Sequence, residues 1–135
     1  MKILILGVSG MLGSTLLRYF SKDKDFEVFG TARSPNSVSC LEAHIKKKIL
    51  FNVDADNFDS VEKVFSQVLP DLVINCVGLV KQLSESSDPI AILPLNSIFP
   101  HQLAKLCKIM GARLIHISTD CVFSGKKGMY KESDI

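Results

Sequence analysis

The sequence lacks the features that would indicate a nucleic acid, a membrane or an oxidising compartment. Its 16 lysines and arginines and 14 aspartates and glutamates give a formal net charge of +2, too near neutral to predict a polyanionic partner. No apolar run approaches the length of a bilayer span. The four cysteines, Cys40, Cys76, Cys107 and Cys121, form no C-x-x-C pair. We therefore expect reduced core cysteines in a cytoplasmic protein that binds neither nucleic acid nor membrane.

Metal-ligand spacing and internal repeats are missing as well. No cluster of His, Cys and acidic residues has the spacing of metal ligands, so we predict no metal site. The 135 residues contain no low-complexity linker and suffice for one domain with a substantial core, so we predict one domain over residues 1–135. His116 lies in an expected strand and is predicted to be a hydrogen-bonded core residue, whereas His44 and His101 are expected to be partly solvated on helices.

The first twenty residues have the pattern of a strand, a glycine turn and a helix. Residues 3–6 (ILIL) are a short branched apolar run, typical of a strand buried on both faces of a parallel sheet. Gly7 suits a tight turn, Gly10 the close approach of a pyrophosphate, and Gly13 the close packing of a helix on the sheet. The N–H groups at the start of such a helix bind anions without a basic side chain. This stretch therefore predicts a nucleotide site.

The rest of the chain alternates between strand and helix patterns. Strands are expected at residues 3–6, 26–31, 49–51, 71–76 and 113–118, and helices at 11–20, 34–44, 57–67 and 89–110. Asp88 is expected to cap the last helix, Pro94 and Pro100 to break or kink it, and Gly111 to end it. This order predicts an α/β fold, a Rossmann-type doubly wound parallel sheet with strand order 3-2-1-4-5 and helices on both faces.

The end of the second expected strand indicates which dinucleotide binds. A carboxylate there accepts the ribose hydroxyls of NAD, whereas a cation pairs with the extra phosphate of NADP. This chain has Thr31-Ala32-Arg33 at that point, and Glu27 lies at the wrong end of the strand. Arg33 therefore favours NADP, and NAD stays possible.

Four stretches together carry a family resemblance. They are Gly7-x-x-Gly10-x-x-Gly13, residues 70–75 (PDLVIN), the helix around Asn96, and residues 118–125 (STDCVFSG). With them the chain resembles the extended short-chain dehydrogenase/reductase superfamily, most closely its dTDP-4-dehydrorhamnose reductase branch, whose signature is S-T-D-x-V-F-x-G. The resemblance extends over the whole chain but covers only the N-terminal part of such an enzyme.

The resemblance also implies site residues. The pyrophosphate would be held by the glycine turn and helix start, the adenosine by the ends of the second and third strands, and the nicotinamide ribose by the end of the fourth. The cofactor residues implied are Gly7, Ser9, Gly10, Met11, Leu12, Thr31, Arg33, Asn52, Val53, Cys76, Val77 and Gly78. Asn75 and Asn96 would tie backbone groups together beneath the site. Thr119 matches the catalytic Ser/Thr, which hydrogen-bonds the substrate carbonyl.

The catalytic tyrosine and lysine of the family, spaced Y-x-x-x-K, are not in this sequence. Tyr19 is followed four residues later by Asp23, and Tyr130 by Asp134. We therefore expect the NADP-binding part of a reductase acting on a keto sugar nucleotide, inactive as 135 residues alone. The alternatives are a non-catalytic regulatory subunit that resembles methionine adenosyltransferase β, and a nucleotide-sugar epimerase or dehydratase. An open apolar edge at the fifth strand would favour self-association.

Overall fold

The sheet at the centre of the structure has five parallel strands. The structure is a computed structural model that describes residues 1–79, 88–119 and 122–134. Its strands are β1 (Lys2–Leu6), β2 (Glu27–Thr31), β3 (Ile49–Leu50), β4 (Leu72–Asn75) and β5 (Arg113–His116). They lie in the order β3-β2-β1-β4-β5, and every neighbouring pair is parallel. The predicted Rossmann-type order is thereby confirmed.

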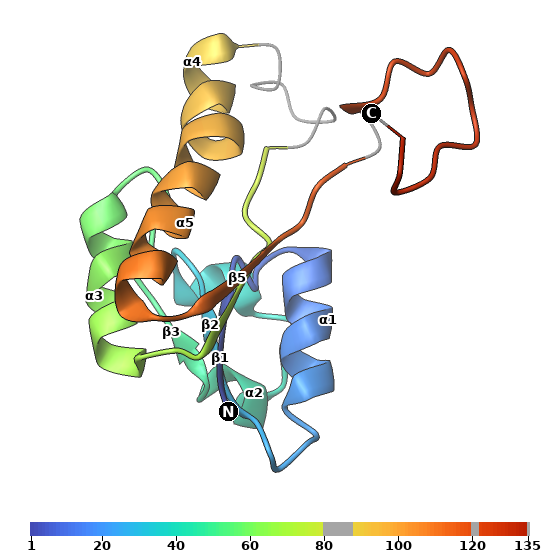
Figure 1. Cartoon of the computed structure of the whole chain (residues 1–135). Coiled ribbons are helices and arrows are strands. Elements are labelled where there is room, and N and C mark those ends of the chain that lie inside the picture. Colours follow the sequence, from blue (N-terminus) through green and yellow to red (C-terminus); the bar gives the residue numbers. More distant parts are fainter. Residues whose placement is uncertain (80–87, 120–121, 135) are drawn as a thin grey trace.

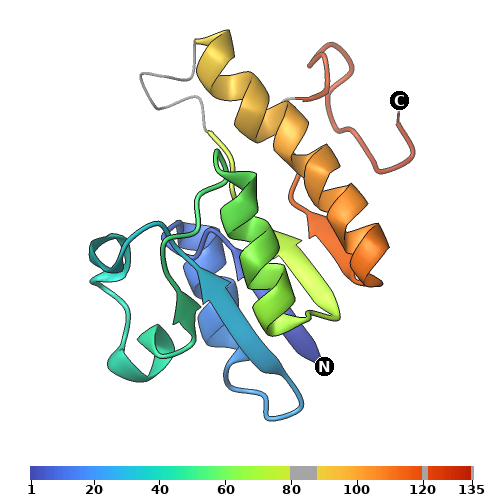
Figure 2. The same ribbon diagram turned by 90° about the vertical axis from the view of Figure 1, so that its left-hand side faces the viewer.

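Helices cover both faces of this sheet. They are α1 (Met11–Phe20), α2 (Ala43–Lys46), α3 (Phe58–Val68), α4 (Pro89–Ile92) and α5 (Phe99–Met110). Successive residues of β1 point to opposite faces, so Ile3 is buried in one cluster with Leu17 of α1 and Leu4 in the other with Phe65 of α3. Figures 1 and 2 show α3 and α5 together on one side of the sheet and α1 on the other. Burial on both faces explains why β1 is an uninterrupted apolar run.

The long helical stretch from Pro89 to Met110 begins and ends as predicted but differs in its middle. The Asp88 carboxylate accepts a hydrogen bond from the N–H of Ile90 at 2.9 Å, and Gly111 ends the stretch with a φ of 71°. We expected the prolines to break or kink it. The α-helix is interrupted around Pro94, where Leu93–Ile98 (η3) form a π-helix between α4 and α5, whereas Pro100 lies in the first turn of α5 without a break. Proline lacks the N–H that the regular α-helical ladder needs, and a wider turn accommodates that loss.

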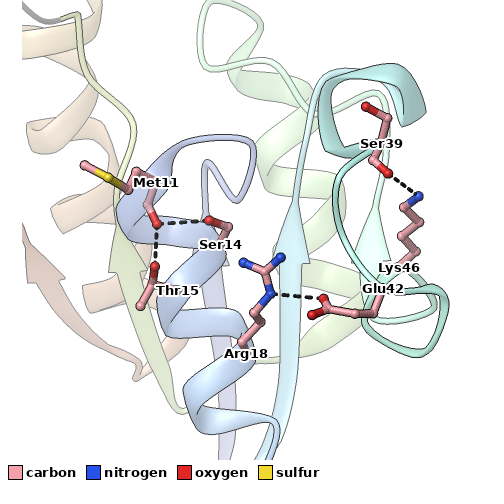
Figure 3. A network of polar contacts seen from close by, with 7 residues as sticks. All are labelled: Met11, Ser14, Thr15, Arg18, Ser39, Glu42 and Lys46. Atoms are coloured by element: carbon pink, nitrogen blue, oxygen red, sulfur yellow. Dashed lines mark hydrogen bonds and ion pairs between the residues drawn. The ribbon is translucent and has the colours of Figure 1, made fainter.

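The segment between β2 and β3 was predicted as one short helix and forms two short turns. Pro35–Val38 (η1) is a 3₁₀-helix, and α2 follows it. Arg18 Nε of α1 donates to Glu42 Oε2 at 3.0 Å, and Lys46 Nζ donates to the Ser39 carbonyl at 2.9 Å (Figure 3). The backbone N–H of Glu42 and then Arg18 lower the pKa of the Glu42 carboxyl. The Arg18–Glu42 contact joins the segment to α1, and the Lys46–Ser39 contact joins its two turns to each other.

The prediction that the cysteines lie in the core holds for some of them, and the fifth strand lies exposed at the edge of the sheet. Cys107 is buried and Cys76 half-buried, as expected, but Cys40 is exposed, so the core prediction was wrong for that thiol. Cys121, the fourth cysteine of that prediction, lies outside the described residues. β5 lies at one edge of the sheet, where Ile115 is 43% and Ile117 42% exposed. Residues 122–134 form an irregular segment beyond β5 (Figure 1). Within the described ranges, no helix has the length and apolar character needed to cross a bilayer.

Candidate functional site

The glycine turn between β1 and α1 forms the centre of the site. Gly7 has a φ of +83°, and a Cβ there would lie 3.2 Å from the Cys76 carbonyl carbon. The Gly7 N–H donates to Thr31 Oγ1 at 3.3 Å, and the Val8 N–H donates to the Thr31 carbonyl at 3.0 Å. A Cβ at Gly13 would lie only 2.4 Å from the Gly7 carbonyl oxygen. The fold itself therefore requires glycine at positions 7 and 13.

Gly10 differs from the other two glycines of the turn. Its φ is −79°, which any residue adopts, and a Cβ would meet only the Gly7 oxygen, at an ordinary 3.6 Å. It caps the N-terminus of α1, whose first turn carries no acidic residue. The first N–H groups of a helix have no partner within the helix and attract anions. The surrounding protein therefore leaves open the space in front of Gly10.

A hollow of about 640 Å³ opens beside this turn, at the carboxyl ends of the strands. This volume lies within the range of small-molecule sites, about 300–1,000 Å³. Nine residues predicted for the cofactor line it: Gly7, Ser9, Gly10, Thr31, Arg33, Val53, Cys76, Val77 and Gly78. The backbones after β2 and β3 are joined there, because the N–H of Val53 donates to the Ala32 carbonyl at 3.3 Å. The sheet thus brings four separate predicted stretches to one hollow.

Three predicted cofactor residues do not line this hollow, and one of them, Leu12, lines a second hollow instead. Met11 is 88% exposed, and Asn52 is exposed with a φ of 61° at the turn after β3. Sequence reasoning also missed the two acidic residues of the lining, Asp54 and Asp56. Both residues follow β3 at the same edge of the sheet as Arg33. Their position just after an expected strand was the sequence signal that could have placed them in the site. It missed as well the helical wall of Ile90, Ala91, Leu95 and Phe99, which no local pattern assigns to a site.

A second hollow of about 340 Å³ lies on the other side of the β4 end. It shares Cys76, Val77, Gly78 and Leu79 with the first hollow and includes Leu12 and Thr119 from the predicted set. Burial raises the pKa of the Cys76 thiol, which therefore stays protonated near neutral pH. The hollow with most of the predicted cofactor residues and the hollow with the predicted catalytic residue thus share residues 76–79.

The predicted structural asparagines hold the wall between the hollows. Asn75, which is 1% exposed, accepts the N–H of Val77 through Oδ1 at 3.0 Å. Asn96 of η3 accepts the N–H of Leu79 and donates to its carbonyl, both at 2.8 Å. The expectation that the asparagines tie backbone groups together is confirmed for Asn96, whereas Asn75 holds one backbone N–H and the ring of His116.

His116 and Tyr130 were both set aside as catalysts on sequence grounds. His116 is hydrogen-bonded as predicted, with Nδ1 at 3.1 Å from Asn75 Nδ2, but it is exposed and lines the second hollow, so its placement in the core was wrong. The reason is that β5 is an edge strand. Tyr130 stacks on Phe123, and the Ser124 hydroxyl and Lys127 N–H, each at 3.1 Å from its hydroxyl, lower its pKa. His44 and His101 are exposed, as expected. The described residues contain no group of three or more His, Cys, Asp or Glu able to hold a metal.

The sheet order, the glycine turn and the hollow at the strand ends define a protein of the Rossmann-type α/β class. Within this class, a family model described as RmlD substrate binding domain matches residues 1–135, and the chain belongs to that family.

Three relatives illustrate the match. The probable low-salt glycan biosynthesis reductase Agl14 of Haloferax volcanii is 29% identical over 131 residues, 96% of this chain and 41% of the relative. A hypothetical dTDP-4-dehydrorhamnose reductase from Sulfolobus tokodaii superposes with a TM-score of 0.81 at 29% identity, over 100% of this chain and 45% of that one. A dTDP-4-dehydrorhamnose reductase from Bacillus anthracis, solved with NADP, superposes at 0.71 with 24% identity, over 94% and 39%. The chain spans less than half of each of these proteins.

Proposed function

We propose that residues 1–135 bind NADP(H) and form the cofactor-binding part of a reductase that transfers hydride to a keto sugar nucleotide. The observation that carries the proposal is Gly10, which lines the larger hollow although nothing in the fold requires glycine there. A residue without a side chain at a helix N-terminus leaves room for a pyrophosphate beside the free N–H groups. The residues present therefore fit the cofactor. The NADP complex of the Bacillus anthracis relative agrees with this choice.

Each group of the chain has a separate task in this proposal. The N-terminus of α1 binds the pyrophosphate, and Arg33 pairs with the 2′-phosphate of the adenosine ribose. Cys76, Val77 and Gly78 form the passage from the first hollow to the second. Bound NADPH supplies a hydride. In the second hollow, the Thr119 hydroxyl donates a hydrogen bond to the carbonyl oxygen of the substrate.

The substrate class and compartment belong to the same proposal. The reductases among the relatives support a nucleotide-sugar substrate. The free thiols of Cys40, Cys76 and Cys107 support a reducing compartment, the cytoplasm. Self-association through β5 stays a prediction, supported by the exposed Ile115 and Ile117 at the sheet edge.

Arg33→Ala should weaken NADPH binding while leaving NADH binding nearly unchanged, because only NADPH carries the phosphate that Arg33 faces. A hydrogen bond to a charged group contributes about 1.5–3 kcal/mol, so the expected loss is about 10- to 100-fold. Fluorescence titration of both cofactors measures it. Arg113→Ala is the matched control, because Arg113 is exposed and lines neither hollow. Equal losses for the two cofactors, or no loss, would remove Arg33 from the phosphate site.

Asp56→Asn should tighten NADPH binding more than NADH binding. Among the described residues of the larger hollow, Arg33 is the only cation, while Asp54 and Asp56 are both anionic. A carboxylate in the same hollow repels the added phosphate through water by about 1 kcal/mol. Replacing this carboxylate with an amide should therefore tighten NADPH binding a few-fold. Titrations at low and high salt check this, with Asp59→Asn on the exposed face of α3 as the control. An equal gain in affinity for NADPH and NADH would contradict this role of Asp56.

A further inference from the structure

A contact across the β4–β5 pair places a histidine at the second hollow in a defined chemical form. Asn75 and His116 are partners in the parallel register, and Asn75 Nδ2 lies 3.1 Å from His116 Nδ1. Asn75 is buried, whereas His116 is exposed and lines the hollow together with Ser118 and Thr119. A buried amide therefore orients a solvent-accessible imidazole.

The orientation of the Asn75 amide follows from its second partner. Its Oδ1 accepts the backbone N–H of Val77 at 3.0 Å, and a backbone N–H can only donate. The NH₂ group of Asn75 is thereby turned toward His116. Since this NH₂ group can only donate, Nδ1 of His116 must accept, and an accepting Nδ1 carries no proton. The network assigns the neutral Nε2–H tautomer to His116.

The remaining ring nitrogen is then a hydrogen-bond donor. Asn75 is the hydrogen-bond partner of His116 within the described residues, so Nε2–H is left for a ligand. None of the described residues that line the second hollow carries a formal charge, and Cys76 is the titratable group there besides His116. A neutral donor in an uncharged hollow suits a neutral acceptor such as an amide oxygen.

We propose that His116 is a positioning residue, held by Asn75 as the Nε2–H tautomer so that it donates a hydrogen bond to the carboxamide oxygen of the nicotinamide. This inference rests on the proposed NADP(H) function, in which the cofactor passes residues 76–78 to reach Thr119. The nicotinamide is the cofactor end that enters the second hollow, and its carboxamide is uncharged. His116 thus orients the ring rather than taking part in proton transfer.

The tautomer is tested without any ligand. Long-range proton–nitrogen-15 spectra of the labelled chain distinguish a protonated from an unprotonated ring nitrogen, and the exposed His44 and His101 serve as internal controls. His116 is expected to show a protonated Nε2 and an unprotonated Nδ1. Asn75→Asp keeps an acceptor for the Val77 N–H but presents an acceptor to the ring, so Nδ1 should become protonated. A wild-type His116 with a protonated Nδ1, or with the same nitrogen-15 pattern as the two controls, overturns the assignment.

The positioning role is tested by comparing NADP⁺ with 2′-phospho-ADP-ribose, which lacks the nicotinamide. His116→Phe should weaken NADP⁺ roughly threefold to tenfold, as for one neutral hydrogen bond, and leave the shorter ligand unchanged. His116→Gln, which can accept from Asn75 and donate to the ligand, should restore NADP⁺ binding. Equal weakening of both ligands indicates a merely structural role and overturns the proposal, as does no weakening of either. If wild type binds neither ligand, the proposed function itself fails, whatever the tautomer.

Discussion

Gly10→Val is expected to abolish measurable NADP(H) binding while the chain still folds. The branched side chain would occupy the space in front of the α1 N-terminus, where the pyrophosphate must approach, and a loss of about 100-fold or more corresponds to about 2.7 kcal/mol. The fold tolerates it because φ at Gly10 is −79° and a Cβ would lie 3.6 Å from its nearest neighbour. Loss of a favourable N-cap residue costs only about 1 kcal/mol of stability. Cofactor titration and thermal unfolding measure the two effects separately.

Gly13→Ala is the matched control, with the opposite expected result. Its Cβ would lie 2.4 Å from the Gly7 carbonyl oxygen and 3.0 Å from the Val8 Cα, so α1 must move away from the turn. Overpacking of this kind costs about 1–3 kcal/mol, and more where backbone must shift. The variant should therefore unfold at a lower temperature. Undiminished NADPH binding by Gly10→Val would show that the glycine turn does not contact the cofactor.

The second large effect expected is the absence of reductase turnover by the 135-residue chain. Thr119 lines the second hollow and can polarise a carbonyl, but neither tyrosine of the sequence has a lysine four residues later. Tyr130 is held instead by Ser124, Lys127 and the ring of Phe123. Positioned general acid catalysis contributes about 10²–10⁴-fold, and the orientation of two reactants about 7–11 kcal/mol. Without the acid, no oxidation of NADPH above background is expected.

The assay follows NADPH absorbance with dTDP-4-dehydrorhamnose, beside an active dTDP-4-dehydrorhamnose reductase as the positive control. A parallel titration establishes that the chain has bound NADPH, so that lack of turnover is not lack of cofactor. Turnover that disappears in Thr119→Val would mean that another group of this chain delivers the proton. In that case Tyr130 and His116 would be the first residues to replace.

The sequence by itself determined the elements and the order of the sheet. Burial on both faces makes β1 an apolar run, and the 3.6-residue period of α1 and α3 marks the face that each buries. The roles of four residues could be predicted from the nearby sequence. Gly7 and Gly111 have a positive φ, Gly13 packs against the turn before it, and Asp88 accepts the N–H two residues on. Right-handed crossovers between parallel strands then leave few possible sheet orders.

Only the tertiary structure decided which side chains share a hollow. Asp54 and Asp56 line the larger hollow with Arg33 because the loops after β2 and β3 meet at one edge of the sheet, and Ile90 and Phe99 line it from α4 and α5. Met11 and Asn52 fall outside the lining although their neighbours in sequence belong to it. The Asn75–His116 pair depends on the register between β4 and β5. Local patterns report the preferences of one element, whereas these contacts depend on how separate elements are aligned and packed.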